Sequence, residues 1–244
     1  MFDQDTIITI IGRRVVRRLI HTMLHIDVNQ LGELPAGPKI YAPNHPTTLD
    51  PLVVGTLFSE PVHVLITESA FKVPIVRDYL RAEGHIPVVT GRGADAYQGA
   101  LDLLRKGKNV AIFPEGALSP LDSTRKMEVG KLHTGTVRLA LETGAPIIPL
   151  GIALNADALH FINTGVLDPY GKMEVARLIT HGPYAITIGT PEYVYGNVQD
   201  QPFVRSLSAR LEQQLAHLQW QSEQRVRKLL LAPVAPLEVV HSLN

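Results

Sequence analysis

The stretch Asn44-His45-Pro46-Thr47-Thr48-Leu49-Asp50 is the part of the sequence from which the fold can be worked out. An apolar run at positions 39–42 leads into it, and a run with helical spacing at positions 51–58 follows it. His45 therefore lies where a strand is expected to end and a helix to begin. Open α/β sheets bind their ligands at such points, so this heptapeptide is the first candidate for a functional site.

The spacing of His45 and Asp50 restricts how the two side chains can meet. On one straight helix, side chains five positions apart would diverge by roughly 140°, at about 100° per residue. They meet only if His45 lies on the turn and Asp50 lies in the first helical turn, which suits Pro46, Thr47 and Thr48 as residues at a helix start. Two interpretations stay open. The pair is a histidine base held by a carboxylate, or Asp50 merely caps the helix.

The composition is that of a globular chain without a strong overall charge. It has 244 residues, of which 45% are hydrophobic, and 23 Lys plus Arg balance 23 Asp plus Glu, so no global field attracts nucleic acid. The absence of cysteine excludes disulfides, thiolate zinc sites and a thiol nucleophile, and it fits a reducing compartment. The remaining histidines show no metal-ligand spacing, so we expect no metal. We also expect neither a transmembrane helix nor a signal peptide.

Residues 1–30 are expected to form a basic amphipathic helix that precedes the main domain, residues 31–244. Residues 5–26 contain no proline and fit a single helix. One side of this helix is apolar and the other is basic; the apolar side holds Ile8, Ile11, Val15, Val16, Leu19, Ile20 and Met23, and the basic side holds Arg13, Arg14, Arg17, Arg18 and His21. Such a helix can lie in a membrane interface with its arginines toward anionic headgroups. Alternatively, it packs on the domain with a solvated basic face.

The rest of the chain alternates between predicted strands and helices. Positions 27–38 suggest a short polar strand and a turn, with Leu31 and Leu34 pointing inward. Further strands are predicted at 40–44, 62–67, 86–89, 109–113, 147–153 and 185–188, and helices at 51–58, 68–83 (interrupted at Pro74), 95–105, 135–142 and 201–230. This alternation predicts an α/β fold, a single domain with a mostly parallel twisted sheet and helices on both faces.

Four motifs resemble those of the glycerolipid acyltransferases, and of the 1-acyl-sn-glycerol-3-phosphate (lysophosphatidic acid) acyltransferases in particular. The likeness runs from about Leu34 to Ile152. The motifs, in order, are Asn44-His45-x-x-x-x-Asp50 with Pro51-Leu52; Glu68-x-x-Phe71-Lys72-Val73-Pro74 with Gly84-x-Ile86-Pro87-Val88 and Arg92; Ile112-Phe113-Pro114-Glu115-Gly116 with Ser119; and Ala145-Pro146-Ile147-Ile148-Pro149-Leu150. Four motifs in the family's order at about its spacing are far more specific than any one of them.

The resemblance implies transfer of a fatty acyl group from a thioester, on coenzyme A or acyl carrier protein, to a lipid hydroxyl. His45 would be the general base and Asp50 the residue that orients it. Attack would give a tetrahedral intermediate directly, without an acyl-enzyme, which agrees with the absence of a Gly-x-Ser-x-Gly elbow. The donors for its oxyanion are expected among backbone N–H groups near the His45 turn. No cofactor is implied beyond the acyl thioester.

The resemblance also implies how the acceptor is held. Lys72 and Arg92 match residues that bind the acceptor phosphate, although both could be solvated surface charges instead. Glu115 and Gly116 match residues that shape the acceptor site. A glutamate after four apolar residues is costly to bury unless donors bond to it, so Glu115 is expected to bind donors, in an acceptor role or in tying loop amides together.

Two departures from the family pattern bear on the acceptor. The third motif usually continues as Thr-Arg, whose arginine contacts phosphate, whereas this chain has Ala117-Leu118. Arg92 also lies a residue or two further from its strand than is usual. Arg125 or Lys126 could replace the missing arginine, and His133 stands where many relatives carry a lysine. Two alternatives to an enzyme that acylates a lysophospholipid therefore stay open. One is a non-phosphate lipid acceptor, such as a glycolipid or a hydroxy-acyl lipid; the other is a lipid-binding module without turnover.

The expected partners follow from this reading. They are an acyl thioester donor, a lipid acceptor and an anionic membrane surface bound by the N-terminal helix, with acyl carrier protein as an alternative to coenzyme A as the carrier. The expected place is the cytoplasmic face of a membrane, with the protein bound peripherally and acting in phospholipid biosynthesis.

Overall fold

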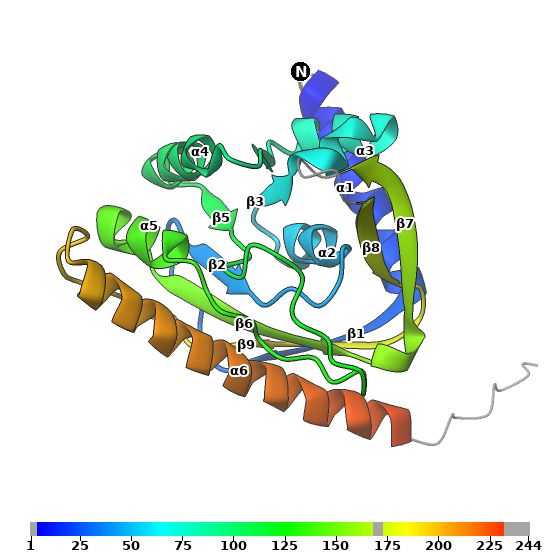
Figure 1. Cartoon of the computed structure of the whole chain (residues 1–244). Coiled ribbons are helices and arrows are strands. Elements are labelled where there is room, and N and C mark those ends of the chain that lie inside the picture. Colours follow the sequence, from blue (N-terminus) through cyan, green and yellow to red (C-terminus); the bar gives the residue numbers. More distant parts are fainter. Residues whose placement is uncertain (1–3, 168–172, 232–244) are drawn as a thin grey trace, which may run out of the picture.

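The computed structural model describes residues 4–167 and 173–231 (Figure 1). Its strands, in chain order, are β1 Leu24–Gln30, β2 Ile40–Pro43, β3 Val62–Thr67, β4 Ile86–Val88, β5 Asn109–Ala111, β6 Ile147–Leu154, β7 Leu159–Leu167, β8 Met173–Ile179 and β9 Gly182–Ile188. Its helices are α1 Gln4–Met23, α2 Asp50–Leu57, α3 Pro74–Ala82, α4 Gly93–Arg105, α5 Gly135–Thr143 and α6 Gln201–Leu231, with short 3₁₀ turns at Glu68–Lys72 and Ala156–Ala158.

Seven of these strands form one sheet in the order β1-β9-β6-β2-β5-β3-β4. All neighbours are parallel except β6 and β9, which are antiparallel. The eight residues of β6 are all buried because helices cover both faces at the centre of the sheet. The predicted α/β fold, with a mostly parallel sheet and helices on both faces, is confirmed.

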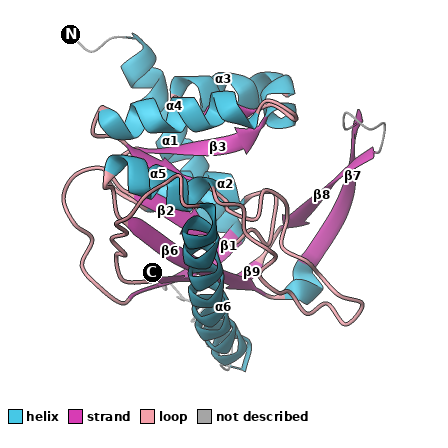
Figure 2. Cartoon of the chain, turned by 60° about the vertical axis from the view of Figure 1, so that its left-hand side comes forward, coloured by secondary structure: helices cyan, strands magenta, loops and turns pink. Residues whose placement is uncertain are grey.

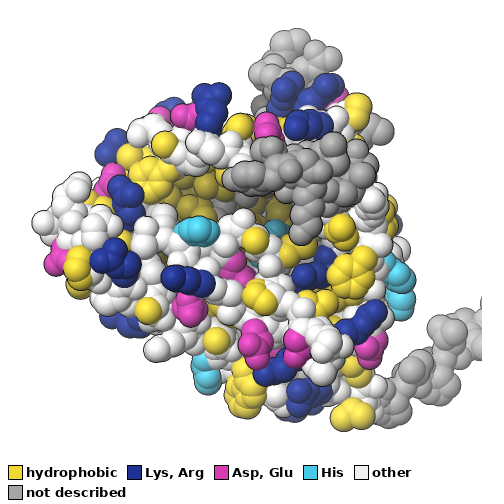
Figure 3. All heavy atoms as spheres, in the orientation of Figure 1, with side chains coloured by type: hydrophobic (Ala, Val, Ile, Leu, Met, Phe, Trp, Pro, Cys, Tyr) yellow, Lys and Arg dark blue, Asp and Glu magenta, His cyan; other side chains and the backbone are white. Residues whose placement is uncertain are grey.

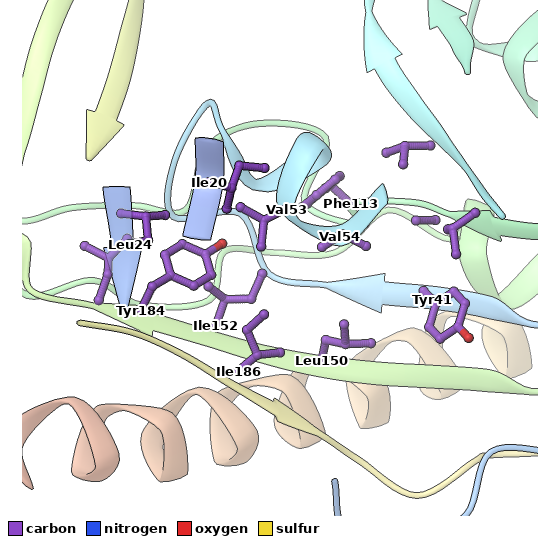
Figure 4. Close-up of a cluster of buried hydrophobic side chains, with 14 of the residues drawn as sticks. Ile20, Leu24, Tyr41, Val53, Val54, Phe113, Leu150, Ile152, Tyr184 and Ile186 are labelled. Carbon is purple, nitrogen blue, oxygen red and sulfur yellow. The ribbon is translucent and has the colours of Figure 1, made fainter. Parts of the chain in front are cut away.

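Two hydrophobic clusters fill the space on either side of the sheet. One packs α1, α2 and α3 against alternate side chains of the strands, and part of it, including Tyr41, Val53 and Leu150, is drawn in Figure 4. The other packs α4, α5 and α6 on the opposite face, with Ile40 and Ile147 from the strands. Adjacent residues of β2 thus point into different clusters, as the period of two along a strand requires.

The close approach of α6 to β6 depends on Gly151. A Cβ atom at this position would lie 2.1 Å from the carbonyl carbon of Leu218 and 2.2 Å from the nitrogen of Gln219, both in the backbone of α6. The contact is also hydrogen bonded, because the Ser222 hydroxyl donates to the Gly151 carbonyl at 2.7 Å. Helix and strand therefore meet backbone to backbone, and a side chain at position 151 has no room.

The N-terminal prediction is wrong in its last part. The helix was expected to reach residue 26, but it ends at Met23, and Leu24–Gln30 forms β1, which pairs in parallel with β9. The segment Leu24-His25-Ile26-Asp27-Val28 alternates apolar and polar residues, the period of a strand. Leu31 was expected to point inward but is exposed, while Leu34 packs against the core as expected.

A second, two-stranded sheet was not predicted. Strands β7 and β8 pair antiparallel and stand apart from the main sheet in Figures 1 and 2. We refer to this pair as the β7–β8 hairpin. Its first strand contains Asn163 and Gly165, which do not favour a strand, and its apolar and polar residues do not alternate regularly, so the sequence pattern was too weak to reveal it.

His85 lies in the core rather than in a site. Its Nδ1 accepts a hydrogen bond from the backbone N–H of Val64 at 3.0 Å, and its Nε2 is buried without a partner in the described part of the chain. Burial, with smaller effects of His63 and Arg13, lowers the pKa of His85 to about 3. The imidazole therefore stays neutral in the folded protein at any pH near neutrality.

This buried histidine predicts a loss of stability in mild acid. The unfolded state binds a proton at a pKa of about 6.5 and the folded state does not, so each pH unit below 6.5 costs about 1.4 kcal/mol of the free energy of unfolding. Between pH 7 and pH 5, urea unfolding of the wild type should lose about 2 kcal/mol more than that of His85→Gln. The exposed His181→Gln serves as the control and should keep the wild-type slope. Equal slopes for His85→Gln and the wild type would contradict the assignment.

Candidate active site

His45 and Asp50 meet in the way that their spacing requires. Strand β2 ends at Pro43 and α2 begins at Asp50, so His45 lies on the turn and Asp50 opens the helix. His45 Nδ1 lies 3.0 Å from Asp50 Oδ2. The His45 ring also packs on Phe113 with a 4.2 Å distance between ring centroids, and its side chain keeps 17% of its surface exposed. Because the Asp50 carboxylate holds Nδ1, Nε2 is the ring nitrogen that remains for exchanging a proton with a bound molecule.

Asp50 is fully buried and surrounded by donors. Its oxygens accept the backbone N–H of Thr47 at 2.7 Å, the Thr47 hydroxyl at 2.5 Å and the Tyr184 hydroxyl at 2.7 Å, in addition to the histidine. Burial and the neighbouring Asp50 raise the pKa of Tyr184 well above its usual value, so its hydroxyl remains a donor. Asp50 thus holds the turn and the histidine together. It does not cap α2, whose N-cap residue is Leu49 without a side-chain hydrogen bond, and the role of the pair in proton transfer stays a prediction.

Glu115 is joined directly to this turn. Its Oε1 accepts the backbone N–H of His45 at 2.9 Å and the Ser119 hydroxyl at 2.7 Å, and its Oε2 accepts the N–H of Gly130 at 2.6 Å. Ser119 closes the loop, because its own N–H donates to the His45 carbonyl at 2.7 Å. The expectation that a buried Glu115 binds donors is confirmed, and the donors are the loop amides.

Gly116, next to Glu115, adopts a backbone conformation that favours glycine. Its φ is +65°, and a Cβ there would lie 2.9 Å from Cδ2 of His133. His133 is therefore placed beside the third motif by the lack of a side chain at Gly116. The predicted role of Gly116 in the acceptor site stays a prediction.

The order of the strands explains which predicted residues meet. His45, Glu115, Lys72 and Arg92 follow β2, β5, β3 and β4, whose carboxyl ends share one edge of the sheet. Strand β5 lies directly beside β2, whereas β4 is three positions away, about 14 Å at roughly 4.8 Å per strand. Hence His45 and Glu115 are joined by a hydrogen bond, whereas Arg92 lies further from His45 along this edge of the sheet.

Lys72 and Arg92 are both exposed and face acidic neighbours. The Lys72 side chain is 59% exposed, and its Nζ lies 4.0 Å from Glu68. The Arg92 side chain is 70% exposed and pairs with Asp95 at 2.6 Å. In the described residues, neither bonds to His45, Asp50 or Glu115. Their roles as acceptor ligands stay predictions.

The residues suggested as replacements for the missing arginine are engaged elsewhere. Arg125 has a positive φ of 60° and donates to the carbonyl of Ala156 at 2.8 Å. Lys126 pairs with Glu128 at 2.6 Å. Within the described ranges, no group of His, Asp and Glu is arranged to hold a metal ion.

Arg177, from β8, is a residue at this site that sequence reasoning missed, as is Tyr184 of β9. Nη1 of Arg177 donates to the carbonyl of Pro46 at 3.1 Å and to that of Ser119 at 2.8 Å. Partial burial lowers the pKa of Arg177, while Asp50 and Glu115 oppose that shift. The guanidinium therefore joins the two loops that carry His45 and Glu115. It lies 131 positions from Pro46 in a segment without a clear strand pattern, so no local signal indicated it.

The face of the molecule in Figure 3 shows the surroundings of the sheet edge. Hydrophobic side chains gather in a recess below the layer of α3 and α4, with charged side chains of both signs around it. A histidine paired with a buried carboxylate at the carboxyl edge of a parallel sheet lies where open α/β sheets bind their ligands.

Comparison with known proteins identifies the family. The sequence model of the acyltransferase family matches residues 25–153. The chain therefore belongs to the acyltransferase family, and the resemblance to glycerolipid acyltransferases seen in its motifs is confirmed.

Three similar proteins illustrate this membership. The chloroplastic 1-acyl-sn-glycerol-3-phosphate acyltransferase BAT2 of Brassica napus is 25% identical over 188 residues, which cover 74% of this chain and 48% of that protein. The lyso-ornithine lipid O-acyltransferase of Pseudomonas aeruginosa is 26% identical over 138 residues, which cover 56% and 51%. The chain thus spans about half the length of these curated relatives. The crystal structure of the 1-acyl-sn-glycerophosphate acyltransferase PlsC from Thermotoga maritima shares the fold, with a TM-score of 0.56, 20% identity, and coverage of 89% of this chain and 83% of that one.

Proposed function

We propose that this protein transfers a fatty acyl group from an acyl thioester to a hydroxyl of a lysophospholipid such as 1-acyl-glycerol-3-phosphate. The observation that carries the proposal is the 3.0 Å contact between His45 Nδ1 and the buried Asp50 carboxylate, at the carboxyl edge of the sheet. The names of two relatives support the reaction class, because one is a 1-acyl-sn-glycerol-3-phosphate acyltransferase and the other a lyso-ornithine lipid O-acyltransferase.

In the proposed mechanism, His45 Nε2 accepts the proton of the acceptor hydroxyl while the oxygen of that hydroxyl attacks the thioester carbonyl. The tetrahedral intermediate then collapses, the carbon–sulfur bond breaks, and the departing thiolate takes the proton from the imidazolium. An ester and a free thiol result. Asp50 holds the ring in the required tautomer and stabilises the imidazolium during the reaction.

The backbone N–H groups expected to stabilise the oxyanion already donate hydrogen bonds within the described structure. From His45 to Leu49, each backbone N–H already donates within the protein: that of His45 to Glu115, that of Thr47 to Asp50, that of Thr48 to the Arg177 carbonyl, and that of Leu49 to the Thr47 hydroxyl; Pro46 has none. These amides hold the turn in shape. The oxyanion would therefore be stabilised by groups outside this turn.

The proposal is tested by thiol release from palmitoyl-CoA with a panel of acceptors: lysophosphatidate, glycerol 3-phosphate, a zwitterionic lysophospholipid and lyso-ornithine lipid. Release that depends on an acceptor and on His45 supports acyl transfer. If none of them releases thiol, the panel is repeated with palmitoyl-acyl carrier protein. No release with either donor would contradict the proposal and favour a lipid-binding module.

A second candidate is the same chemistry on a lipid acceptor without a phosphate. Two observations favour it. Leu118 replaces the family's arginine. Arg92, which follows β4, a strand about 14 Å from β2, pairs with Asp95 of α4. One relative is named for lyso-ornithine lipid. Release with lyso-ornithine lipid and none with lysophosphatidate would decide for this candidate.

We further propose that α1 binds the surface of an anionic membrane at its cytoplasmic face. Val16 and Ile20 pack toward the core, whereas apolar side chains at intervals of four remain exposed, namely Ile11, Val15, Leu19 and Met23. Arg14, Arg17 and Arg18 are exposed beside them. An exposed surface that is half apolar and half basic suits the boundary between headgroups and acyl chains. Among the described residues, the helices lack the combination of length and apolarity needed to cross a bilayer.

Replacing Arg14, Arg17 and Arg18 with glutamine should weaken binding to phosphatidylserine vesicles by roughly a hundredfold, at about 1 kcal/mol per basic residue. Arg13 is left unchanged because its guanidinium donates to the carbonyls of Phe58 and Glu60, at 2.6 Å and 3.0 Å, and so fastens the helix to the domain. Vesicle co-sedimentation measures the effect.

The matched control removes three exposed cations from the end of α4, by replacing Arg105, Lys106 and Lys108 with glutamine. It lowers the net charge equally and should leave vesicle binding nearly unchanged. Equal weakening by both triple variants would show a general charge effect, and α1 would then be an ordinary packed helix.

A further inference from the structure

The two carboxylate oxygens of Asp50 have different partners. Oδ2 lies 3.0 Å from His45 Nδ1 and accepts the backbone N–H of Thr47 at 2.7 Å. Oδ1 accepts the Thr47 hydroxyl at 2.5 Å and the Tyr184 hydroxyl at 2.7 Å. Within the described ranges, Tyr184 is the one donor to this carboxylate that comes from outside residues 45–50. The orientation of Asp50 therefore depends on its own turn and on one residue from a distant strand.

Tyr184 reaches Asp50 from the interior of the sheet. It lies in β9, opposite Ile26 of β1 and Leu154 of β6, and its side chain belongs to the same buried cluster as that of Ile186. Figure 4 draws its ring among the apolar side chains of this cluster, with the hydroxyl as its polar atom. A phenylalanine would fill the same space as the ring. Packing alone therefore does not explain the hydroxyl, whereas its bond to the carboxylate does.

The bond from Tyr184 acts on a carboxylate that is shielded from water. Asp50 and Tyr184 are both 0% exposed. A hydrogen bond to an ionised group is stronger than one between neutral groups, and a low local dielectric strengthens it further. The hydroxyl draws negative charge toward Oδ1 and away from Oδ2, the oxygen that faces His45. A donor on the carboxylate therefore weakens its attraction for a positively charged imidazolium.

Glu115 and Arg177 are the other charged groups that contact the His45 turn in the described structure. Glu115 accepts the backbone N–H of His45 at 2.9 Å, and Arg177 donates to the carbonyl of Pro46 at 3.1 Å. The charge of Arg177 also acts on Asp50 and on Glu115. Both groups bond to the backbone of the turn rather than to the imidazole. A change in the charge on Asp50 Oδ2 therefore acts on the His45 ring directly, through the bond at Nδ1.

We propose that Tyr184 is a positioning residue that sets the strength of His45 as a base. Its hydroxyl fixes the orientation of the Asp50 carboxylate and takes up part of its charge. The imidazolium is then stable enough to form when the acceptor hydroxyl gives up its proton, and acidic enough to return that proton to the departing thiolate. This inference rests on the proposed acyl transfer, in which His45 accepts a proton and then releases it.

Tyr184→Phe tests the proposal because it removes the hydroxyl and keeps the ring. More of the Asp50 charge then acts on His45, so the midpoint of the acid limb of kcat/KM should move to higher pH by about half a unit to one unit. Below this midpoint, kcat/KM should fall by the corresponding factor, about three- to tenfold. The KM values for donor and acceptor at the alkaline plateau should stay within about twofold of the wild type, because Tyr184 is fully buried.

Tyr41→Phe is the matched control. It removes a phenolic hydroxyl from the same buried cluster, but Tyr41 stacks on Phe58 and does not bond to Asp50. This variant should keep the pH profile of the wild type. Circular dichroism at each pH restricts the comparison to the range in which all of the proteins are folded.

A titration without substrates separates this role from a purely structural one. The ring signal of His45 is followed by NMR in protein labelled with ¹³C-histidine, and His45→Gln identifies that signal by its loss. In Tyr184→Phe, the titration midpoint of this signal should rise by about half a unit to one unit, as in the rate profile. A 3-fluorotyrosine placed at position 184 by amber suppression is a stronger donor and should move the midpoint to lower pH. This protein keeps the proposal testable if Tyr184→Phe does not fold.

Two results would overturn the proposal. The first is an unchanged His45 titration in folded Tyr184→Phe or, if that variant does not fold, in the fluorotyrosine protein. The second is an equal shift in Tyr41→Phe, which would show a general response of the core. A shifted titration in Tyr184→Phe alone, from a wild type that transfers no acyl group, would support the role of Tyr184 and contradict the proposed function. Transfer that depends on His45, with the wild-type profile in Tyr184→Phe, would contradict the role of Tyr184 and support the proposed function.

Discussion

Replacing His45 with alanine is expected to lower the rate of acyl transfer by roughly 10²–10⁴-fold, the contribution typical of a general base. The rate falls because alanine has no nitrogen to accept the proton of the acceptor hydroxyl, and His45 is the imidazole that contacts Asp50 in the described structure. The fold should survive, since the turn is held by bonds that the variant keeps. Its backbone N–H still donates to Glu115, and Asp50 still accepts from Thr47 and Tyr184.

The measurement is initial-rate thiol release at saturating donor, with circular dichroism to show that the fold is intact. His181→Ala removes an exposed histidine and should keep the wild-type rate. Asp50→Asn supplies a further check, because an amide at the same place no longer stabilises an imidazolium and its NH₂ can favour the wrong tautomer. A folded His45→Ala protein with the rate of the wild type would rule out the proposed mechanism.

Replacing Gly151 with alanine is expected to destabilise the protein strongly. The added Cβ would stand 2.1 Å and 2.2 Å from backbone atoms of Leu218 and Gln219, so a rotamer change cannot relieve the contact. Helix α6 would have to move away from β6 and give up the 2.7 Å bond between Ser222 and the Gly151 carbonyl. Overpacking usually costs 1–3 kcal/mol, and this backbone clash should exceed about 3 kcal/mol.

Urea unfolding followed by tryptophan fluorescence measures this cost, because the single tryptophan, Trp220, lies in α6 two residues from Leu218. Gly135→Ala is the matched control: a Cβ there meets no atom within 4 Å, and alanine favours the helix that begins at that residue. It should be neutral or slightly stabilising. A Gly151→Ala protein within 1 kcal/mol of the wild type would show that α6 does not lie on β6 as described.

The predictions from the sequence were most accurate for strands and helices that are determined by a local pattern of residues. Strand β3 was placed at its observed bounds because Val62-His63-Val64-Leu65-Ile66-Thr67 suits a buried strand between clear turns. The prediction failed at Leu24–Gln30, where an alternating strand directly follows a helix with no proline or glycine between them. It also missed the β7–β8 hairpin, whose two strands, LHFINTGVL and MEVARLI, show no regular alternation of apolar and polar residues.

The same distinction separates the residues of the site. The His45–Asp50 contact spans five positions, so the sequence predicted the backbone arrangement that the contact requires, and the structure shows that arrangement. Glu115 was found because burial of a carboxylate requires donors, although their identity came only from the structure. Arg177 bonds to backbone carbonyls, which any sequence supplies, so its place depended on the packing of the hairpin against the turn.

The hydroxyl of Tyr184 on Asp50 has a consequence for synthesis of the protein. It joins the first motif of the chain to a residue of β9 that the ribosome adds 134 positions after Asp50. A nascent chain that ends before β9 carries its base and carboxylate but lacks this donor, the sheet partner of β1 and the hydrophobic cover of the turn. The catalytic centre is thus assembled late in translation, after most of the apolar surface that it needs has already been made.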